Sequence, residues 1–280
     1  MTELKGKVVV ITGAGSGIGR SLAKRAARAG MKIVLAGRNP ANLSQVEREL
    51  REQGATTLCV PTDVSKQQDV EMLARKSFDS FKAVHLLINN AGITGGSICE
   101  STLADWQWIM GINLWSVVYG VKAFLPLMEA QMDRSRIVNV ASIAGIVASA
   151  DLGMYCVTKY GVVALSEALY YELAQRKSKV SVSVVCPSYV KTPILDTGRN
   201  RPPQVAHENA VRLTEAEMNA TWESLGTKSN SKVWLPDDVA DYVFDAIGKE
   251  KLYIVTHPES KTWIRTRMEN ILNESNPATE

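Results

Sequence analysis

Ser142, Tyr155 and Lys159 have residue types and a spacing that suit proton transfer. Tyr155 and Lys159 are four residues apart, so on a helix they would share one face. Ser142 lies thirteen residues before Tyr155, shortly after the largely apolar run 137–140, which is typical of a strand end. A free phenol has a pKa near ~10, and a neighbouring cation would lower that pKa toward a useful range. The trio predicts a site in which Tyr155 exchanges a proton with an alcohol or a carbonyl group.

A Tyr and a Lys one turn apart are common on helix surfaces, so this pair gains its meaning from a second motif upstream. A strand-like run over 8–11 leads into a glycine-rich turn and then a helical pattern. Glycine allows positive φ and a close backbone approach, and a helix N-terminus offers unpaired N–H groups to a phosphate. The flexible-loop alternative does not explain the strand before the turn and the helix after it. The predicted pyrophosphate contacts are Gly13, Ser16, Gly17, Ile18 and Gly19.

The end of the second strand-like run bears on the choice of coenzyme. The sequence there reads Ala36-Gly37-Arg38-Asn39, with no carboxylate. An acidic residue at this point would bind the ribose hydroxyls of NAD, whereas an arginine suits the 2′-phosphate of NADP. Arg38 can contact a phosphate with two N–H groups. We therefore expect NADP(H) to be preferred and NAD(H) to be possible; the alternative is an ordinary solvated arginine.

Short apolar runs alternate with longer amphipathic stretches along most of the chain. This alternation predicts βαβ units and hence an α/β fold: one doubly wound, Rossmann-type, mostly parallel sheet with helices on both faces. The predicted strands are 8–11, 33–35, 57–60, 84–88, 137–140, 180–186 and 252–255. The predicted helices are 18–29, 41–53, 68–81, 105–131 and a segment that carries Tyr155 and ends near residue 175.

The rhythm breaks between residues 191 and 234, where prolines punctuate a stretch with no strand pattern and one helical pattern at 213–225. Long irregular insertions of this kind are usually lids or disordered segments, and we interpret this one as a substrate lid. A C-terminal extension follows at about 256–280, with a helix expected at 259–272. The whole chain, 1–280, is long enough for a single catalytic domain with one large core.

The composition excludes several classes of protein. With 32 basic and 29 acidic residues the net charge is +3, which does not favour nucleic acid or a membrane surface as a partner. No uninterrupted apolar run approaches the ~20 residues of a spanning helix, and no secretory signal is visible. The four cysteines and three histidines show no metal-ligand spacing. We expect a cytoplasmic protein with no metal site.

Several further motifs occur in order along the chain. Asp63-Val64 and Asn89-Asn90-Ala91-Gly92 follow the third and fourth predicted strands, and a Pro187–Thr192 segment follows the sixth. With the glycine turn and the Tyr155 motif, they make the chain resemble the short-chain dehydrogenase/reductase family over about residues 5–255. The resemblance implies coenzyme contacts from Asp63, Val64, Asn90, Ala91, Gly92, Tyr155, Lys159, Pro187, Ser188, Val190 and Thr192.

The resemblance also implies a catalytic tetrad of Asn113, Ser142, Tyr155 and Lys159. Tyr155 would be the general acid in ketone reduction and the base in the reverse direction. Lys159 would lower the pKa of Tyr155 and hold the nicotinamide ribose, Ser142 would orient the carbonyl, and Asn113 would hold a relay water. Ser188 departs from the pattern, since it replaces a glycine and so disfavours positive φ there. His85 stands where the family often has Asp.

These features predict an NAD(P)-dependent oxidoreductase that interconverts a hydrophobic secondary alcohol and a ketone. Two alternatives remain: an epimerase or dehydratase using the same coenzyme, and a non-catalytic nucleotide-sensing scaffold. The predicted pocket walls are Ile143, Ile146, Val147, Leu152, Ile194, Leu195, Met218, Trp222 and Trp234, with Arg199 and Arg201 within reach of an anion. A homodimer or homotetramer is expected, with Leu114, Val118, Val121, Val162, Leu165 and Leu169 as the buried patch or, alternatively, facing their own sheet.

Overall fold

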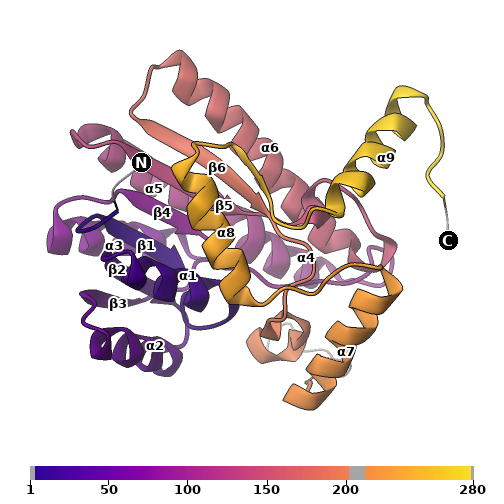
Figure 1. Cartoon of the computed structure of the whole chain (residues 1–280), viewed down its shortest axis with the longest axis horizontal. Coiled ribbons are helices and arrows are strands. Elements are labelled where there is room, and N and C mark those ends of the chain that lie inside the picture. Colours follow the sequence, from indigo (N-terminus) through magenta and orange to yellow (C-terminus); the bar gives the residue numbers. More distant parts are fainter. Residues whose placement is uncertain (1–3, 202–211, 279–280) are drawn as a thin grey trace.

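A seven-stranded sheet forms the centre of the molecule, in a computed structural model that describes residues 4–201 and 212–278. The strand order is β3-β2-β1-β4-β5-β6-β7, and neighbouring strands are parallel throughout (Figure 1). The predicted parallel, doubly wound sheet is thereby confirmed. The strands are β1 (Val8–Thr12), β2 (Lys32–Gly37), β3 (Thr57–Pro61), β4 (Leu86–Asn89), β5 (Ser135–Val140), β6 (Val180–Cys186) and β7 (Tyr253–Val255).

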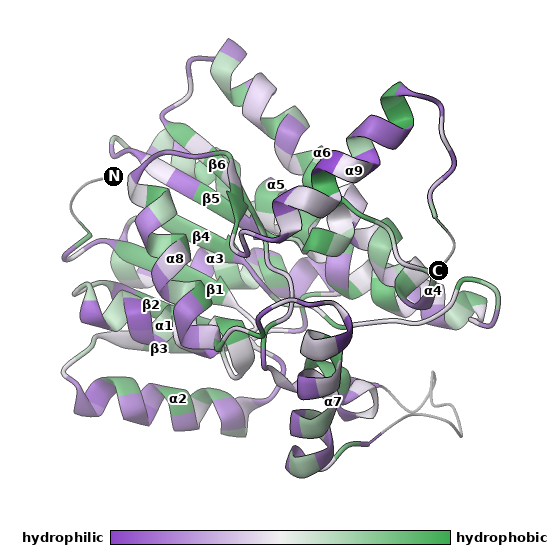
Figure 2. Ribbon diagram, turned by 45° about the vertical axis from the view of Figure 1, so that its right-hand side comes forward, coloured by the Kyte–Doolittle hydropathy of each residue, from purple (hydrophilic) through white to green (hydrophobic). Residues whose placement is uncertain are grey.

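Helices cover both faces of the sheet, which explains why the central strands are apolar almost without alternation. Leu22 and Leu43 are fully buried on one face, and Leu73 and Phe124 on the other. Figure 2 shows the hydrophobic strands enclosed between helices whose outer sides are hydrophilic. The first face carries α1 (Gly17–Arg28), α2 (Pro40–Glu52) and α8 (Pro236–Gly248). The second carries α3 (Gln67–Phe81), α5 (Ser116–Ala130) and α6 (Gly153–Gln175).

The direction of winding reverses between β1 and β4. β1 pairs with β2 on one side and with β4 on the other, so consecutive crossovers leave this point in opposite directions. In sheets of this kind ligands bind at the carboxyl ends of the strands beside such a reversal. The loops after Thr12, Asn89 and Val140 all begin at that edge, which brings the sequence motifs together.

One continuous helical stretch, Leu103–Ala130, contains α4 (Leu103–Met110), the π-helical turn η1 (Gly111–Trp115) and α5. The side chain of Thr102 accepts a hydrogen bond from the Asp105 N–H, and the Asp105 carboxylate accepts one from the Thr102 N–H, which sets the helix start. By length and composition alone this stretch could cross a membrane, and it is the one such helix among the described residues. It is not an uninterrupted apolar run, since polar residues such as Asp105 and Lys122 occur within it. Buried core helices meet the same criterion, and α5 packs on the sheet.

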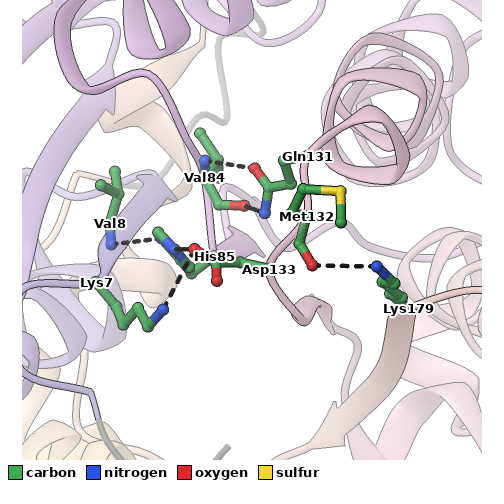
Figure 3. A network of polar contacts seen from close by, with 8 residues as sticks. All are labelled: Lys7, Val8, Val84, His85, Gln131, Met132, Asp133 and Lys179. Atoms are coloured by element: carbon green, nitrogen blue, oxygen red, sulfur yellow. Dashed lines mark hydrogen bonds and ion pairs between the residues drawn. The ribbon is translucent and has the colours of Figure 1, made fainter.

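A polar clip joins the sheet to the loop after α5 at the amino edge of the strands (Figure 3). His85 is buried immediately before β4, where its Nδ1 accepts a hydrogen bond from the Val8 N–H at 3.0 Å. Its Nε2 lies 2.9 Å from the Asp133 carboxylate, which also pairs with Lys7 at 3.4 Å. The side chain of Gln131 bonds both the N–H and the C=O of Val84. His85 thus acts as a structural residue that lies far from the carboxyl edge.

The segment predicted as a lid has no named strand among its described residues. It contains the short 3₁₀ turns η4 (Pro193–Leu195) and η5 (Thr197–Asn200) and the helix α7 (Glu215–Lys228), near the predicted 213–225. The middle of the predicted lid, 202–211, lies outside the described residues. Two more 3₁₀ turns, η2 (Ile143–Gly145) and η3 (Ala150–Leu152), follow β5. The C-terminal helix α9 (Ser260–Leu272) matches the predicted 259–272 and projects from the body (Figure 1).

For several of the apolar residues named for subunit contacts the second alternative holds, because they pack inside their own chain. Val162 and Leu169 on α6 are buried within the chain's own core, and Leu114 packs close to Gly161. α6 is apolar around most of its circumference, so the sequence could not show which side meets the sheet. The large apolar side chains exposed on the helical stretch Leu103–Ala130 and on α6 are Leu103, Trp115, Leu127, Val157, Tyr170 and Tyr171.

Candidate active site

A cavity of about 1420 Å³ opens at the carboxyl ends of the strands. Ser142, Tyr155 and Lys159 line it together with the glycine loop, although they lie far apart in sequence. Ser142 follows β5, whereas Tyr155 and Lys159 lie on the first turns of α6, and their side chains meet because η2 packs against that helix. Asn113 does not line the cavity; it is fully buried behind the wall.

Burial dominates the proton affinity of Tyr155. It raises the pKa of the phenol to about 12, while the neighbouring Ser142 side chain acts in the opposite direction. The sequence predicts that a neighbouring cation lowers this pKa; in the structure the pKa is raised instead, because the loss of solvation is the largest effect. The Lys159 Nζ lies 5.5 Å from the centre of the Tyr155 ring. Tyr155 is therefore held protonated, as a proton donor must be.

Lys159 is also almost completely buried, and its burial lowers the pKa of the ammonium to about 8. The Nζ donates a hydrogen bond to the Val140 carbonyl at 2.9 Å, the last residue of β5. This contact fixes the amine at the strand end beside Tyr155. A lysine with so low a pKa can change charge within a unit or so of neutral pH.

The π-helical turn η1 positions Asn113. Its Oδ1 accepts from the Ile93 N–H and its Nδ2 donates to the Ile93 carbonyl, each at 2.9 Å. Nδ2 also lies 3.1 Å from the Thr158 hydroxyl. A Cβ added at Gly92 would lie 3.4 Å from both the Asn113 Oδ1 and the Lys159 Nζ, so the two side chains flank one point. π-Turns of this kind occur often at functional sites.

The glycine loop leaves room for a ligand at the N-terminus of α1. Gly13 and Gly17 have positive φ angles of 67° and 51°, which residues with a side chain rarely adopt. A Cβ at Gly19 would lie 2.3 Å from the Gly13 carbonyl oxygen, so only glycine fits there. Ser16 precedes the helix, and its side chain does not cap it. The first N–H groups of α1 therefore face the cavity that Ser16, Gly17 and Ile18 line.

Thr12 helps to build the site, although it is not among the site residues predicted from the sequence. Its hydroxyl accepts hydrogen bonds from the backbone N–H groups of Asn90 and Ala91, at 2.9 and 3.0 Å. The Asn90 side chain in turn donates to the Thr12 carbonyl at 2.8 Å. These bonds tie the glycine loop to the Asn90–Gly92 loop across the β1–β4 junction. The sequence feature that could have pointed to Thr12 is its position at the end of a strand, directly before the glycine turn.

The predicted adenosine end of the cavity is lined by Arg38, Asp63 and Val64. Asp63 accepts hydrogen bonds from the Ser65 N–H and hydroxyl at 3.1 and 2.7 Å, which fixes its carboxylate in a tight turn. Arg38 is not free in solvent, because it donates to the Asn200 carbonyl at 2.8 Å. The arginine expected to meet a 2′-phosphate thus already contacts the lid.

The next residue of the lid, Arg201, contacts the opposite wall of the cavity. The Arg201 guanidinium pairs with the buried Asp105 carboxylate at 2.5 Å and lies 4.8 Å from the centre of the Trp108 ring. We call residues 193–201 the strap, since it joins the end of β2 to α4 across the cavity. Arg201 does not line the cavity, whereas Arg199 does.

The segment Pro187–Thr192 lies between Ser142 and the glycine loop. The Pro187 carbonyl accepts hydrogen bonds from the Ile143 N–H at 2.8 Å and from the Ser142 hydroxyl at 3.4 Å. A Cβ at Gly17 would meet the Thr192 side chain at 3.2 Å. Ser188 has no positive φ, as its side chain requires. Pro187, Ser188, Val190 and Thr192 all line the cavity, so every predicted coenzyme contact does.

The far end of the cavity is mainly apolar and aromatic. Six of the predicted wall residues line it: Ile143, Val147, Leu152, Ile194, Leu195 and Trp222. Ile146, Met218 and Trp234 do not; the Trp234 ring packs instead against Tyr242 and His257. The structure adds Tyr189, Leu225 and Trp263, the last from α9. Trp263 was missed because nothing in the sequence shows that the C-terminal helix reaches the site.

Two further features bear on function. The described residues contain no group of three or more His, Cys, Asp or Glu side chains that could hold a metal ion. Cys186 lies close to Lys159, and its burial raises the pKa of the thiol to about 12, which makes it inert.

Comparison with known proteins agrees with the fold and identifies the family. The family model described as short chain dehydrogenase matches residues 7–202. A CLA biosynthesis dehydrogenase/reductase of Lactiplantibacillus plantarum is 35% identical over 279 residues, covering 99% of this chain and 97% of that protein. The chain belongs to the short-chain dehydrogenase/reductase family, and its relatives are oxidoreductases.

Solved structures give the same answer. A short-chain dehydrogenase/reductase from Burkholderia phymatum, solved in complex with NAD, is 40% identical and superimposes with a TM-score of 0.90. That match covers 100% of this chain and 99% of the other. A short-chain dehydrogenase from Novosphingobium aromaticivorans is 26% identical with a TM-score of 0.79, covering 99% and 90% of the two chains.

Proposed function

We propose that this oxidoreductase interconverts a hydrophobic secondary alcohol and the corresponding ketone, with NADP(H) as the preferred coenzyme. The observation that carries the proposal is that Tyr155, Lys159 and Ser142 line the same cavity as the glycine loop. A proton donor and a nucleotide-binding loop in one cavity suit a reaction in which a hydride and a proton are transferred to one carbonyl group. A non-catalytic scaffold that only senses a nucleotide would not need a proton donor such as Tyr155.

The glycine cradle fits a nicotinamide coenzyme. The N–H groups at the start of α1 would bind its pyrophosphate, Asp63 and Val64 would lie beside the adenine, and Lys159 would bind the nicotinamide ribose. The coenzyme supplies or accepts the hydride. The protein's own residues would bind, orient and protonate the substrate.

Tyr155 is the proposed general acid in reduction. Its phenol keeps its proton at neutral pH, because burial raises its pKa, and it would give that proton to the carbonyl oxygen as hydride arrives at carbon. Ser142 would donate a second hydrogen bond to the same oxygen. The charged Lys159 would stabilise the phenolate left behind, and Asn113 would hold the loop at Ile93 and a relay water.

The preference for NADP(H) rests on Arg38 and on the absence of a carboxylate at the end of β2. The contact between Arg38 and the Asn200 carbonyl is exposed, so a phosphate can compete for the guanidinium. A relative that is 40% identical was solved with NAD, so both coenzymes must be assayed. Comparing kcat/KM for the two coenzymes, in wild type and Arg38→Ala, tests the preference. An NAD(H) preference in wild type would contradict it.

The substrate class rests on the aromatic and aliphatic far end of the cavity. Tyr189, Trp222 and Trp263 provide broad apolar surfaces, while Asp151, Asp196 and Arg199 are charged residues in the same lining. NADPH oxidation with a panel of bulky aryl or cyclic ketones and short charged ketones tests the proposal. Preference for the bulky set is expected. No turnover of any ketone would contradict the reaction, and preference for the charged set would contradict the substrate class. The cytoplasmic location stays a prediction, testable by cell fractionation.

A further inference from the structure

A second histidine, His257, is fully buried immediately after β7 and the adjoining Thr256. It lies in the C-terminal part of the chain, beyond residues 7–202, which match the family model. Both ring nitrogens have polar partners: Nε2 lies 3.0 Å from the Tyr189 carbonyl, and Nδ1 lies 3.3 Å from the Ser188 N–H and 2.7 Å from the Thr256 hydroxyl. A buried C-terminal residue thus contacts the segment Pro187–Thr192, which is predicted to bind the coenzyme.

The partners of His257 define its tautomer. A carbonyl oxygen can only accept, so the ring proton lies on Nε2 and points at Tyr189. Nδ1 is then an acceptor, as the Ser188 N–H requires. Burial lowers the pKa of this ring, and the Trp234 ring lies over it at 4.6 Å between centres. His257 is therefore a neutral ring held in one orientation, with Nδ1 as an acceptor and Nε2 as a donor.

A short path of bonds leads from this ring to the catalytic serine. Ser188 directly follows Pro187, whose carbonyl accepts from the Ser142 hydroxyl and from the Ile143 N–H. The Ser142 Oγ also accepts from the Ala144 N–H at 3.1 Å. The position of the Pro187 carbonyl therefore helps to set where the Ser142 hydroxyl points. The Pro187 carbonyl and the Ser188 N–H belong to the same peptide unit, and the Ser188 N–H donates to His257.

The two ring nitrogens of His257 do not contribute equally. The Tyr189 carbonyl also accepts from the Trp234 N–H at 2.9 Å, so it keeps a partner if the Nε2 donor is lost. The Ser188 N–H has no acceptor other than Nδ1 among the described residues. Losing Nδ1 leaves this N–H without a partner next to the catalytic serine.

We infer that His257 is a positioning residue for the reaction, and that its Nδ1 fixes the Ser188 peptide and thereby the Ser142 hydroxyl. The inference rests on the proposed oxidoreductase function, since it assigns Ser142 a role in orienting the substrate carbonyl. It extends that function to a residue outside the tetrad and outside the part of the chain that the family model matches.

Two substitutions of similar size separate the ring nitrogens. His257→Asn can place its amide oxygen near the position of Nδ1, and His257→Gln can place its amide N–H near that of Nε2. In the NADPH-loaded enzyme, the Asn variant is expected to keep kcat within about threefold of wild type, and the Gln variant to lose about tenfold. The KM for the ketone and the Kd for NADPH should change by less than about threefold in both, because their main contacts lie elsewhere.

A control variant and a second readout keep the result interpretable. His85→Asn alters another buried histidine at the opposite edge of the sheet, so it should lower the melting temperature and leave kcat unchanged. Hydrogen exchange of the peptide containing Ser188 needs no turnover: its amide should exchange faster in His257→Gln than in wild type or His257→Asn. Equal kcat and equal exchange in the Asn and Gln variants would overturn the inference. A wild-type enzyme inactive on every ketone would overturn the proposed function alone, because the exchange result would still report on His257.

Discussion

Burial shifts the pKa values of Tyr155 and Lys159 in opposite directions, because it disfavours the charged form of both side chains. It raises the pKa of Tyr155 to about 12 and lowers that of Lys159 to about 8, so at neutral pH Tyr155 is protonated and Lys159 is still mainly charged. For Tyr155 the uncharged form is the proton donor. We expect Tyr155→Phe, which removes only the hydroxyl, to reduce kcat by about a hundredfold or more. Fluorescence titration should show NADPH binding retained, and full activity would contradict the tyrosine mechanism.

The lowered pKa of Lys159 predicts a pH dependence. The ammonium that would stabilise the Tyr155 phenolate is present below about pH 8 and lost above it. Reduction measured as kcat/KM should therefore fall as the pH rises through about 8. Lys159→Arg, which stays charged, should shift the fall to higher pH; an unchanged profile would exclude Lys159 as its cause.

The same group affects folding stability. Between about pH 8 and the ordinary lysine pKa, the unfolded chain binds the Lys159 proton and the folded chain does not, so the free energy of unfolding rises with pH in this range.

At the scale of the elements, the glycine loop is held by close contact between α1 and the loop after β4. A methyl group at Gly19 would collide with the Gly13 carbonyl oxygen and with the Asn90 side chain at 2.6 Å. Gly19→Ala should therefore weaken NADPH binding by at least about tenfold, measured by fluorescence titration. Gly248→Ala at the end of α8 is the matched control, because nothing lies within 4 Å of its added methyl group. Equal affinity in both variants would show that the loop adapts.

The strands and helices could be predicted because their signals are local. Apolar runs bounded by Gly13 and similar breakers located the strands, and the spacing of Tyr155 and Lys159 needed only a helix. The π-turn around Asn113 could not be predicted, since it depends on bonds to Ile93 across the cavity wall. The contact of His257 with Ser188 joins residues 69 positions apart and has no local signal.

At the scale of the whole molecule, the His85 clip stabilises the edge of the sheet opposite the active site. His85→Phe keeps a buried ring but leaves the Val8 N–H without its acceptor, which should cost about 1–3 kcal/mol of unfolding free energy. Asp133→Asn should cost less, because that side chain is 54% exposed. Urea unfolding measures both. An equal loss in the two variants would show that the Asp133 contact, and not the Val8 bond, is what matters.

Subunit assembly is a separate prediction at this scale. Trp115 on η1 and Tyr171 on α6 are 49% and 63% exposed, which is unusual for large aromatic side chains on a monomer surface. Light scattering should give a mass at least twice the 30.6 kDa of the chain. A single species at the mass of one chain would contradict the homodimer or homotetramer.

The strap has a consequence for anyone who redesigns this enzyme. Asn200 bonds Arg38 at the adenosine end, and the next residue, Arg201, pairs with Asp105 on the helix that carries Trp108. Two adjacent residues thus link the end of the cavity where we propose that the coenzyme is selected to the wall on the proposed substrate side. Coenzyme switching by replacing Arg38 would therefore not be modular: it would release one anchor of the strap and shift the enzyme's ranking of ketones. A campaign to change the coenzyme should vary Arg38 and Asn200 together and screen both properties at once.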